Sequence, residues 1–195
     1  MIILKTAHLG LALAAMLFLT GCFVTSRQMP AGTGPISDEA LVGDWRAVDA
    51  DSGKDENVFI HIQKPDANQP LRVILVEDKE YHVYELRTTR VGARNVFSVK
   101  IIAPAEALKE GNDGSFLGYY EAKGADLRFY LLDANKVTAA IRAGKVQGRP
   151  GKEKYDFAEL TGSPADLARF LASDDGWNTR VDEPALMKRL VAGSK

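Results

Sequence analysis

Apolar and polar residues alternate along much of the chain between residues 41 and 131, which is the period-2 pattern of half-buried β-strands. In one run, Val58, Ile60 and Ile62 are separated by Phe59 and His61, so one face of that strand is apolar. Strand-like runs cover residues 41–48, 58–63, 71–76, 81–86, 97–101, 116–120 and 127–131. The short gaps between these runs leave little room for crossover helices, and this favours an antiparallel meander.

Helical patterns come late in the chain. Asp133 is placed to begin a short helix that Gly144 would end. A second helix is predicted after Ser163, because Ser163 and Asp166 have the spacing of a capping box and Pro164 falls in the first turn. Its apolar stripe consists of Leu167, Phe170 and Leu171.

A third helix is predicted to open at Glu183-Pro184, with Leu186, Leu190 and Val191 toward the core. Residues 155–160 read as one more strand. The sequence therefore predicts a mainly β (α+β) fold. We expect an antiparallel meander of seven or eight strands, curled into a barrel or half-barrel, with two or three short helices toward the C-terminus.

The first 21 residues have the layout of a secretory signal, with Lys5 followed by an uncharged run over residues 9–19. That run is too short to cross a bilayer comfortably, although a membrane-spanning anchor stays as an alternative. Leu19-Thr20-Gly21-Cys22 resembles the lipobox of bacterial lipoproteins. The resemblance implies cleavage between Gly21 and Cys22, a diacylglyceryl thioether on Cys22 and usually an acyl chain on the new N-terminus. Two or three acyl chains hold a protein durably on a bilayer.

Cys22 is the only cysteine, so the chain can form no intramolecular disulfide, and an exported thiol of this kind is best explained if it is acylated. An ordinary signal peptide is the alternative. Phe23, not Asp, follows Cys22, which resembles the default sorting of Gram-negative lipoproteins to the outer membrane. The predicted location is therefore the cell envelope, with the lipid anchor in the outer membrane and the protein facing the periplasm if the host is Gram-negative.

Residues 22–39 are rich in Pro, Gly, Ser and Thr, which is typical of a flexible tether. A coil of that length reaches about 21 to 25 Å. Residues 40–195 are predicted to form a single globular domain, since they suffice for one core and show no internal repeat.

Gly43-Asp44-Trp45, at the start of the first strand, resembles the Gly-x-Trp signature of lipocalins. The resemblance implies that Trp45 packs across the closed end of an eight-stranded up-and-down barrel. The inserted helices depart from the lipocalin pattern. The alternative is that Trp45 is a core aromatic under a curved sheet.

The formal net charge is −1, and the chain has no long run of basic residues, which argues against a nucleic-acid partner. Outside the leader only His61 and His82 remain as histidines, and both fall on strand runs where a structural role is usual. Residues 114–118 lack the spacing of a nucleophile elbow. Short carboxylate clusters fit solvated turns better than a calcium loop. We therefore assign no catalytic residue, metal or cofactor from the sequence.

Four tyrosines on the strand runs are candidates to line a ligand mouth, although strand aromatics often serve as core packing. They are Tyr81, Tyr84, Tyr119 and Tyr120. The predicted function is a membrane-anchored envelope lipoprotein that is non-enzymatic and binds an apolar small molecule or an envelope protein, or is structural. The alternative is a membrane-tethered hydrolase that acts on an envelope substrate, with His61 or His82 as base.

Overall fold

The computed structural model describes residues 23–66, 68–103, 114–151 and 157–190. The leader, Gly21 and Cys22 lie outside the described residues, so the predicted lipobox stays a prediction. No helix within the described ranges is long and apolar enough to cross a bilayer.

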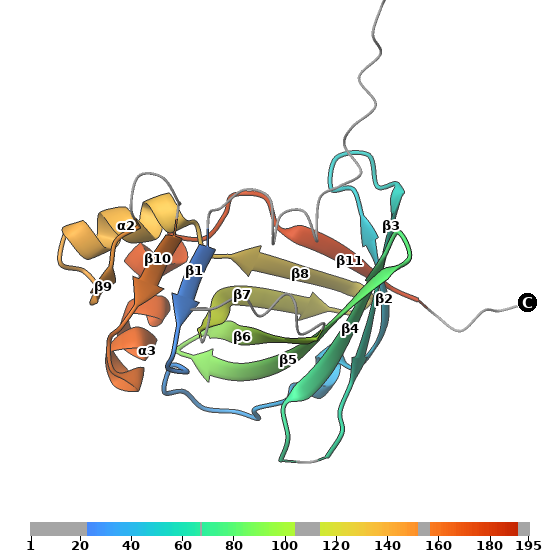
Figure 1. The fold of residues 1–195 in the computed structure, drawn as a ribbon, viewed down its shortest axis with the longest axis horizontal. Coiled ribbons are helices and arrows are strands. Elements are labelled where there is room, and N and C mark those ends of the chain that lie inside the picture. The colour runs from blue at the N-terminus through green and yellow to red at the C-terminus, as the bar shows by residue number, and fades with distance from the viewer. Residues whose placement is uncertain (1–22, 67, 104–113, 152–156, 191–195) are drawn as a thin grey trace, which may run out of the picture.

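Eight antiparallel strands close into a barrel (Figure 1). They are β2 (Gly43–Val48), β3 (Asp55–Gln63), β4 (Leu71–Glu77), β5 (Glu80–Val91), β6 (Arg94–Ala103), β7 (Ser115–Lys123), β8 (Asp126–Leu131) and β11 (Ala185–Arg189). Strands β2 to β8 follow one another as a meander, and β11 pairs with both β8 and β2 to complete the ring. The predicted mainly β meander is confirmed, and the sheet closes fully.

Three connections in the meander are two-residue turns, as the close spacing of the strand runs predicts. The β4–β5 turn consists of Asp78 and Lys79, with φ angles of 45° and 80°. Positive φ at both central residues matches the right-handed twist of the flanking strands. Two further turns, between β5 and β6 and between β7 and β8, begin with Gly92 and Gly124 at φ 59° and 62°. These turns fix the register of the hairpins.

The inside of the barrel is packed with large side chains from every strand. Those at most 1% exposed include Trp45, Ile62, Leu71, Leu127 and Met187. Phe97 and Phe129 meet edge to face with their ring centroids 5.3 Å apart. The alternation read from the sequence thus places its apolar face inward.

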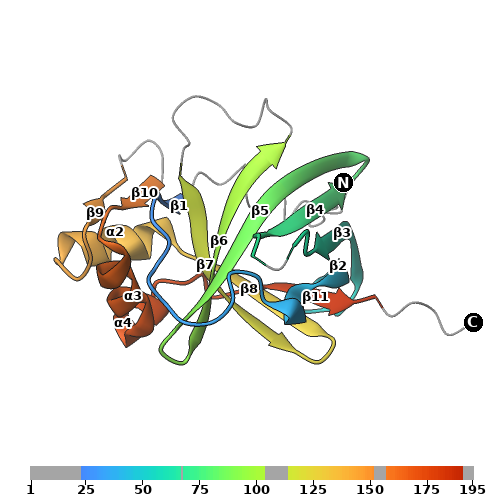
Figure 2. The ribbon, with the colours of Figure 1, turned by 90° about the horizontal axis from the view of Figure 1, so that it is seen from below.

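A helical lobe lies between β8 and β11 in the chain and packs on the outside of the barrel (Figure 2). It contains α2 (Ala134–Arg142), β9 (Gly148–Arg149), β10 (Phe157–Leu160), α3 (Pro164–Ala172) and α4 (Asp174–Trp177). Its core joins Leu167, Phe170 and Leu171 to Leu117 and Tyr119, which face outward from β7. The first two predicted helices are confirmed, with Asp133 and Ser163 as their N-caps.

The third predicted helix is wrong. Residues 185–189 form β11, in which Met187 is fully buried between Ala47 of β2 and Leu127 of β8. Two neighbouring strands offer backbone hydrogen bonds on both sides of this segment, and that tertiary pairing outweighs the local helical pattern. Val191, which was expected on the same helix, lies outside the described residues.

The structure also differs from the flexible tether expected at residues 22–39. Strand β1 (Phe23–Ser26) pairs in parallel with β10 and in antiparallel with the start of β7. Thr33 forms a bridge with Arg90, and the backbone N–H of Thr88 donates to the carbonyl of Ile36. A short 3-10 helix, η1 (Glu39–Leu41), then leads into β2. The described part of this segment is therefore built into the domain by backbone hydrogen bonds, which its polar composition does not reveal.

Candidate functional site

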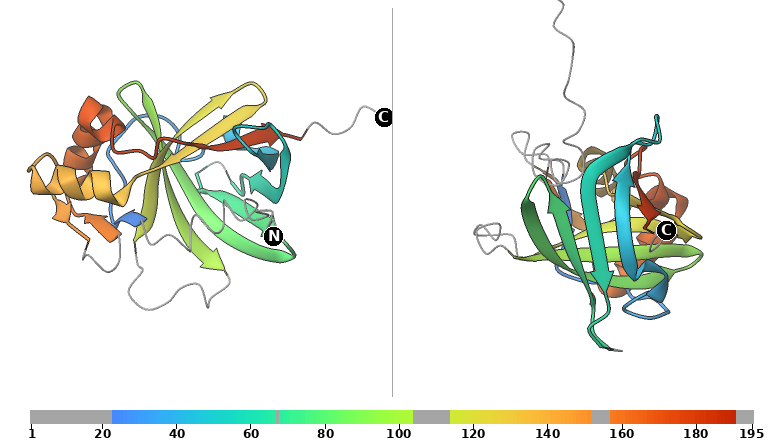
Figure 3. Two further views of the ribbon diagram at one scale, coloured as in Figure 1. Left: turned by 90° about the horizontal axis from the view of Figure 1, so that it is seen from above. Right: turned by 90° about the vertical axis from the view of Figure 1, so that its right-hand side faces the viewer.

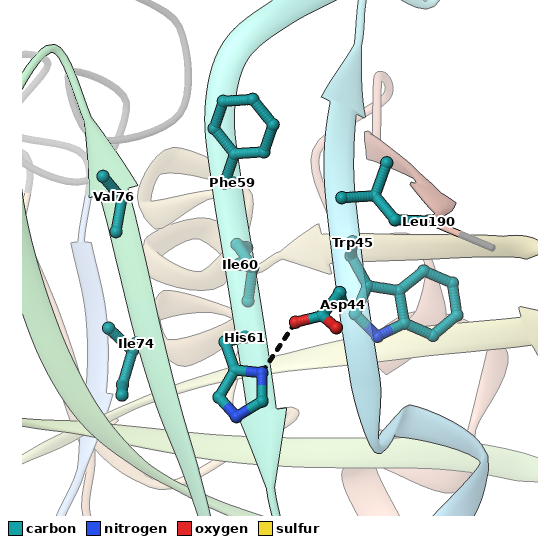
Figure 4. A pocket seen from close by; sticks show the side chains of 8 residues that line it. All are labelled: Asp44, Trp45, Phe59, Ile60, His61, Ile74, Val76 and Leu190. Carbon is teal, nitrogen blue, oxygen red and sulfur yellow. Dashed lines mark hydrogen bonds and ion pairs between the residues drawn. The ribbon is translucent and has the colours of Figure 1, made fainter. Parts of the chain in front are cut away.

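The outer face of β2, β3 and β4 carries an open hollow of about 270 Å³ (Figure 4). The right-hand view in Figure 3 looks onto these three strands. The side chains that form its wall and floor include Asp44, Phe59, His61, Ile74, Val76 and Leu190. Most of this surface is apolar, although it lies on the outside of the barrel.

The strand register explains how these side chains meet. Val58 and Ile60 point into the barrel, so Phe59 and His61 must point outward from β3. Phe59 lies opposite Val76, and His61 lies between Ile74 on one side and Asp44 on the other. Directly opposed side chains on one sheet face are in contact distance. The register of β2, β3 and β4 therefore brings the side chains of the hollow together.

One polar pair interrupts the apolar surface. The Nδ1 atom of His61 lies 2.7 Å from Oδ1 of Asp44, so the imidazole N–H donates to the carboxylate. Both side chains are about half exposed, at 48% and 61%. The hydrogen bond sets the orientation of the ring and turns its Nε2 edge away from Asp44 (Figure 4).

A histidine held by a carboxylate is one component of many general-base sites, but such sites need a nucleophile within hydrogen-bond reach. The residues that line this hollow contain neither a hydroxyl nor a thiol group. Arg46 lies at its edge, where its guanidinium is 4.9 Å from the Phe59 ring centroid and pairs with Asp55. The hollow is thus suited to binding, and catalysis there would require an activated water.

A second hollow, of about 330 Å³, lies in the helical lobe beside α3. Its charged side chains are already paired with one another: Lys145 with Asp175 at 2.6 Å and Arg169 with Asp166 at 2.9 Å. These charges neutralise one another within the lobe, and the surface of this hollow is more polar than that of the β2–β4 hollow.

The two candidate histidines do not come together. His82 lies on the inward face of β5, where its ring centroid is 6.3 Å from that of Tyr84, whereas His61 faces outward. In the part of the chain that the structure describes, no group of three or more His, Cys, Asp and Glu side chains is arranged to hold a metal ion.

The four candidate tyrosines occupy different places, so they do not form one ligand mouth. Tyr81 is 62% exposed and lies opposite Val76 at the edge of the hollow. Tyr84 and Tyr120 are buried inside the barrel, and the Tyr120 hydroxyl donates to Oδ2 of Asp38 at 2.8 Å. The Tyr119 hydroxyl donates to the carbonyl of Leu171 at 3.1 Å in the helical lobe. Burial raises the pKa of each of the three enclosed phenols above its usual range.

Trp45 is 1% exposed and lies in the barrel core next to η1. Its Nε1 donates to the carbonyl of Leu41 at 2.8 Å, and the guanidinium of Arg189 lies 4.2 Å from its ring centroid. Trp45 is therefore a buried aromatic of the barrel core, as both interpretations of Gly43-Asp44-Trp45 require. Sequence reasoning missed Arg189, because its partners lie almost the whole domain away along the chain.

Several residues of the hollow were also missed, and part of the signal was present. The run of residues 71–76 is apolar on both of its faces apart from Arg72. When one face of a strand lies in the core and its outer face is also apolar, the outer face is a candidate interaction surface. Ile74 and Val76 could have been found in this way, whereas Leu190 could not, because it was assigned to a helix.

No family model, no curated protein and no solved structure matches this chain. Its function has therefore to be inferred from its own sequence and surfaces.

Proposed function

We propose that this protein is a lipid-anchored protein of the bacterial cell envelope that acts by binding another envelope protein through the β2–β4 hollow. The anchor rests on Leu19-Thr20-Gly21-Cys22, which resembles a lipobox. In a Gram-negative host, Phe23 after the cysteine favours the outer membrane, with the folded domain in the periplasm. Binding, not catalysis, is favoured because the hollow has apolar walls and contains no side-chain nucleophile.

The observation that carries the proposal is the contrast between the two faces of the barrel wall. The inner face is packed by its own side chains, whereas the outer face around the hollow, from the end of β11 to the start of β5, leaves apolar groups in solvent. Val76 is 40% exposed, Leu190 38% and Tyr81 62%. A small-molecule site encloses most of its ligand, and an open hollow of about 270 Å³ does not. It does have room for an apolar side chain of a partner, seated as an interface anchor.

A hydrolase is the second candidate, and one observation favours it: the 2.7 Å hydrogen bond between His61 and Asp44 inside the hollow. In such an enzyme the free ring nitrogen of His61 would take a proton from water that attacks an envelope substrate. The pair's exposure to solvent weighs against this reading, because general bases act best where water is excluded.

Site-specific photo-crosslinking in living cells tests the binding proposal. A crosslinking amino acid at Val76 is expected to give a discrete protein adduct, which Ile74→Asp abolishes by placing a charge in the hollow. A crosslinker at Arg128, on the exposed face of β8, is the matched control and gives no such adduct. Adducts of the same pattern from both positions would contradict the proposal. Turnover of an envelope substrate that His61→Ala removes would instead support the hydrolase.

Intact-mass spectrometry tests the anchor separately. Mature protein is expected to begin at Cys22 and to carry acyl mass, and Cys22→Ser is expected to block both processing and acylation. A mature N-terminus elsewhere, without acyl mass, would overturn the lipoprotein assignment.

A further inference from the structure

The folded domain begins immediately after the proposed lipid attachment site. Strand β1 starts at Phe23, the residue that follows Cys22 in the sequence. Its four residues pair with β10 from Phe157 to Leu160, and Val24, Thr25 and Ser26 are each at most 3% exposed. The strand is therefore a fixed part of the domain and has no freedom to act as a linker.

The distance between lipid and domain follows from covalent geometry. Consecutive Cα atoms lie about 3.8 Å apart across a trans peptide bond. A flexible coil over residues 22–39 would instead allow about 21 to 25 Å. If Cys22 carries acyl chains, as proposed above, a single peptide bond joins the acylated residue to the first residue of β1. The bilayer surface must then lie against the part of the domain that surrounds β1.

The ring of strands places β1 on the side of the barrel opposite the hollow. β1 pairs with β7, and the hollow is centred on β3. Going round the barrel, β7 is reached from β3 in four steps either through β4, β5 and β6 or through β2, β11 and β8. Figures 1 and 2 agree, since β1 and the helical lobe lie at one end of the long axis and β2 and β3 at the other.

Charge near β1 suits a lipid headgroup surface. The side chains of Arg27 and Arg149, 65% and 76% exposed, both pair with the carboxylate of Glu159 on β10. Two guanidinium groups that share one carboxylate leave a net positive charge beside the strand. Exposed arginine is well suited to hydrogen bond phosphate oxygens.

We infer that the β1 side of the barrel, with Arg27 and Arg149, is a bilayer-contacting surface that turns the β2–β4 hollow toward the aqueous compartment. This inference rests on the proposed acylation of Cys22. It adds that the partner of the hollow approaches from the water, because the anchor holds the opposite side of the barrel on the lipid.

Fluorescence quenching on the full-length acylated protein tests the orientation. Because acylation occupies Cys22, a single engineered cysteine takes the fluorophore. Gln28→Cys, on an exposed residue beside Arg27, reports the β1 side and leaves both arginines in place, and Tyr81→Cys, on an exposed residue at the hollow, is the matched control. The proteins are added to vesicles of phosphatidylcholine and phosphatidylglycerol that contain a headgroup spin-labelled lipid. We expect strong loss of fluorescence at position 28 and little at position 81.

A spacer variant and a mass measurement distinguish failure of the proposed orientation from failure of the proposed anchor. A long Gly-Ser insertion between Cys22 and Phe23 is expected to remove the difference between the two positions, because the domain then tumbles free of the surface. Equal quenching at both positions in the native-length protein, with acyl mass present in the same sample, overturns the orientation and leaves the anchor standing. Absence of acyl mass overturns both the anchor and this inference.

Discussion

Arg189 stacks on Trp45 and also binds the chain just before it. Its guanidinium lies 4.2 Å from the indole centroid, while Nη1 and Nη2 each donate to a backbone carbonyl at 2.7 Å, of Val42 and Ala40 respectively. One side chain at the end of β11 therefore holds η1, the start of β2 and the core tryptophan together. The barrel is fastened at this point by residues from its first and last strands.

Removing that guanidinium should destabilise the whole barrel. We expect Arg189→Ala to lower the free energy of unfolding by about 2 to 4 kcal/mol, because it removes a cation–π contact and two charge-assisted hydrogen bonds. Arg189→Lys should recover only part of this, since an ammonium cannot reproduce the planar fork. Urea unfolding provides the measurement. Lys188→Ala, which removes an exposed ion pair with Asp126 from the neighbouring residue, is the control and should change little.

The two hydrophobic cores can be probed independently. Trp45→Ala in the barrel and Phe170→Ala in the helical lobe should each cost about 3 to 5 kcal/mol, because each leaves a cavity in a packed cluster. Ile102→Ala, at a side chain that is 39% exposed, serves as the control. Melting temperatures that move no further than in the control would show that these clusters do not hold the fold.

Gly118 lies where the barrel has no space for a side chain. A Cβ atom there would come within 2.4 Å of the Tyr130 carbonyl oxygen and 2.6 Å of the Phe97 ring. We expect Gly118→Ala to destabilise by about 1 to 3 kcal/mol through overpacking. At Gly162 the nearest atom would be 3.4 Å away, so Gly162→Ala should be tolerated. Equal stabilities of the two variants, measured by thermal unfolding, would contradict this packing.

Two buried tyrosines should respond in opposite ways to loss of the hydroxyl group. The Tyr84 hydroxyl is buried and has no hydrogen-bond partner among the described residues, whereas that of Tyr119 donates to Leu171. Tyr84→Phe should therefore be neutral or stabilising, and Tyr119→Phe should cost about 1 kcal/mol. Tyr81→Phe, at an exposed position, controls for the change of residue type. A loss at position 84 as large as that at 119 would show that the Tyr84 hydroxyl is satisfied.

Alkaline pH should weaken the fold. Burial raises the pKa of Tyr84, Tyr119 and Tyr120, while an unfolded tyrosine ionises near pH 10. The stability that the protonated phenols contribute is fully present below about pH 10 and is lost as the pH rises above it, because the unfolded chain releases protons first. Unfolding in urea across this range should show the decline, and a triple Tyr→Phe variant should show a shallower one.

Local patterns were sufficient for most of the barrel and insufficient where distant segments meet. The alternation of Val58, Ile60 and Ile62 identified β3, and the Ser163 cap identified α3, because both signals lie within a few residues. The local pattern after Glu183-Pro184 predicts a helix where the structure has β11. The strand forms because Met187 is buried between β2 and β8, and these two strands lie far back in the sequence. The composition likewise predicts a tether where the structure has β1, because the partners of β1, β7 and β10, lie far along the chain.

The candidate site shows the same division. His61 was identified from its residue type, but its partner Asp44 was not, because their pairing depends on the register between β2 and β3. Tyr81, Tyr84, Tyr119 and Tyr120 were grouped by residue type, whereas alternate strand positions send side chains to opposite sheet faces. Which face each occupies depends on the tertiary register.

The late position of β11 has a consequence for how the barrel assembles. The chain emerges N-terminus first, so the meander from β2 to β8 appears before residues 185–189, with the whole helical lobe still to come. Until then β2 and β8 are open edges with unpaired N–H and C=O groups, the usual templates for aggregation. Closure must wait for a contact between nearly opposite ends of the domain, and such long-range contacts form slowly. A chain that has emerged only as far as the helical lobe exposes both edges at once, so a chaperone that shields β-strands has its longest opportunity to act at this stage.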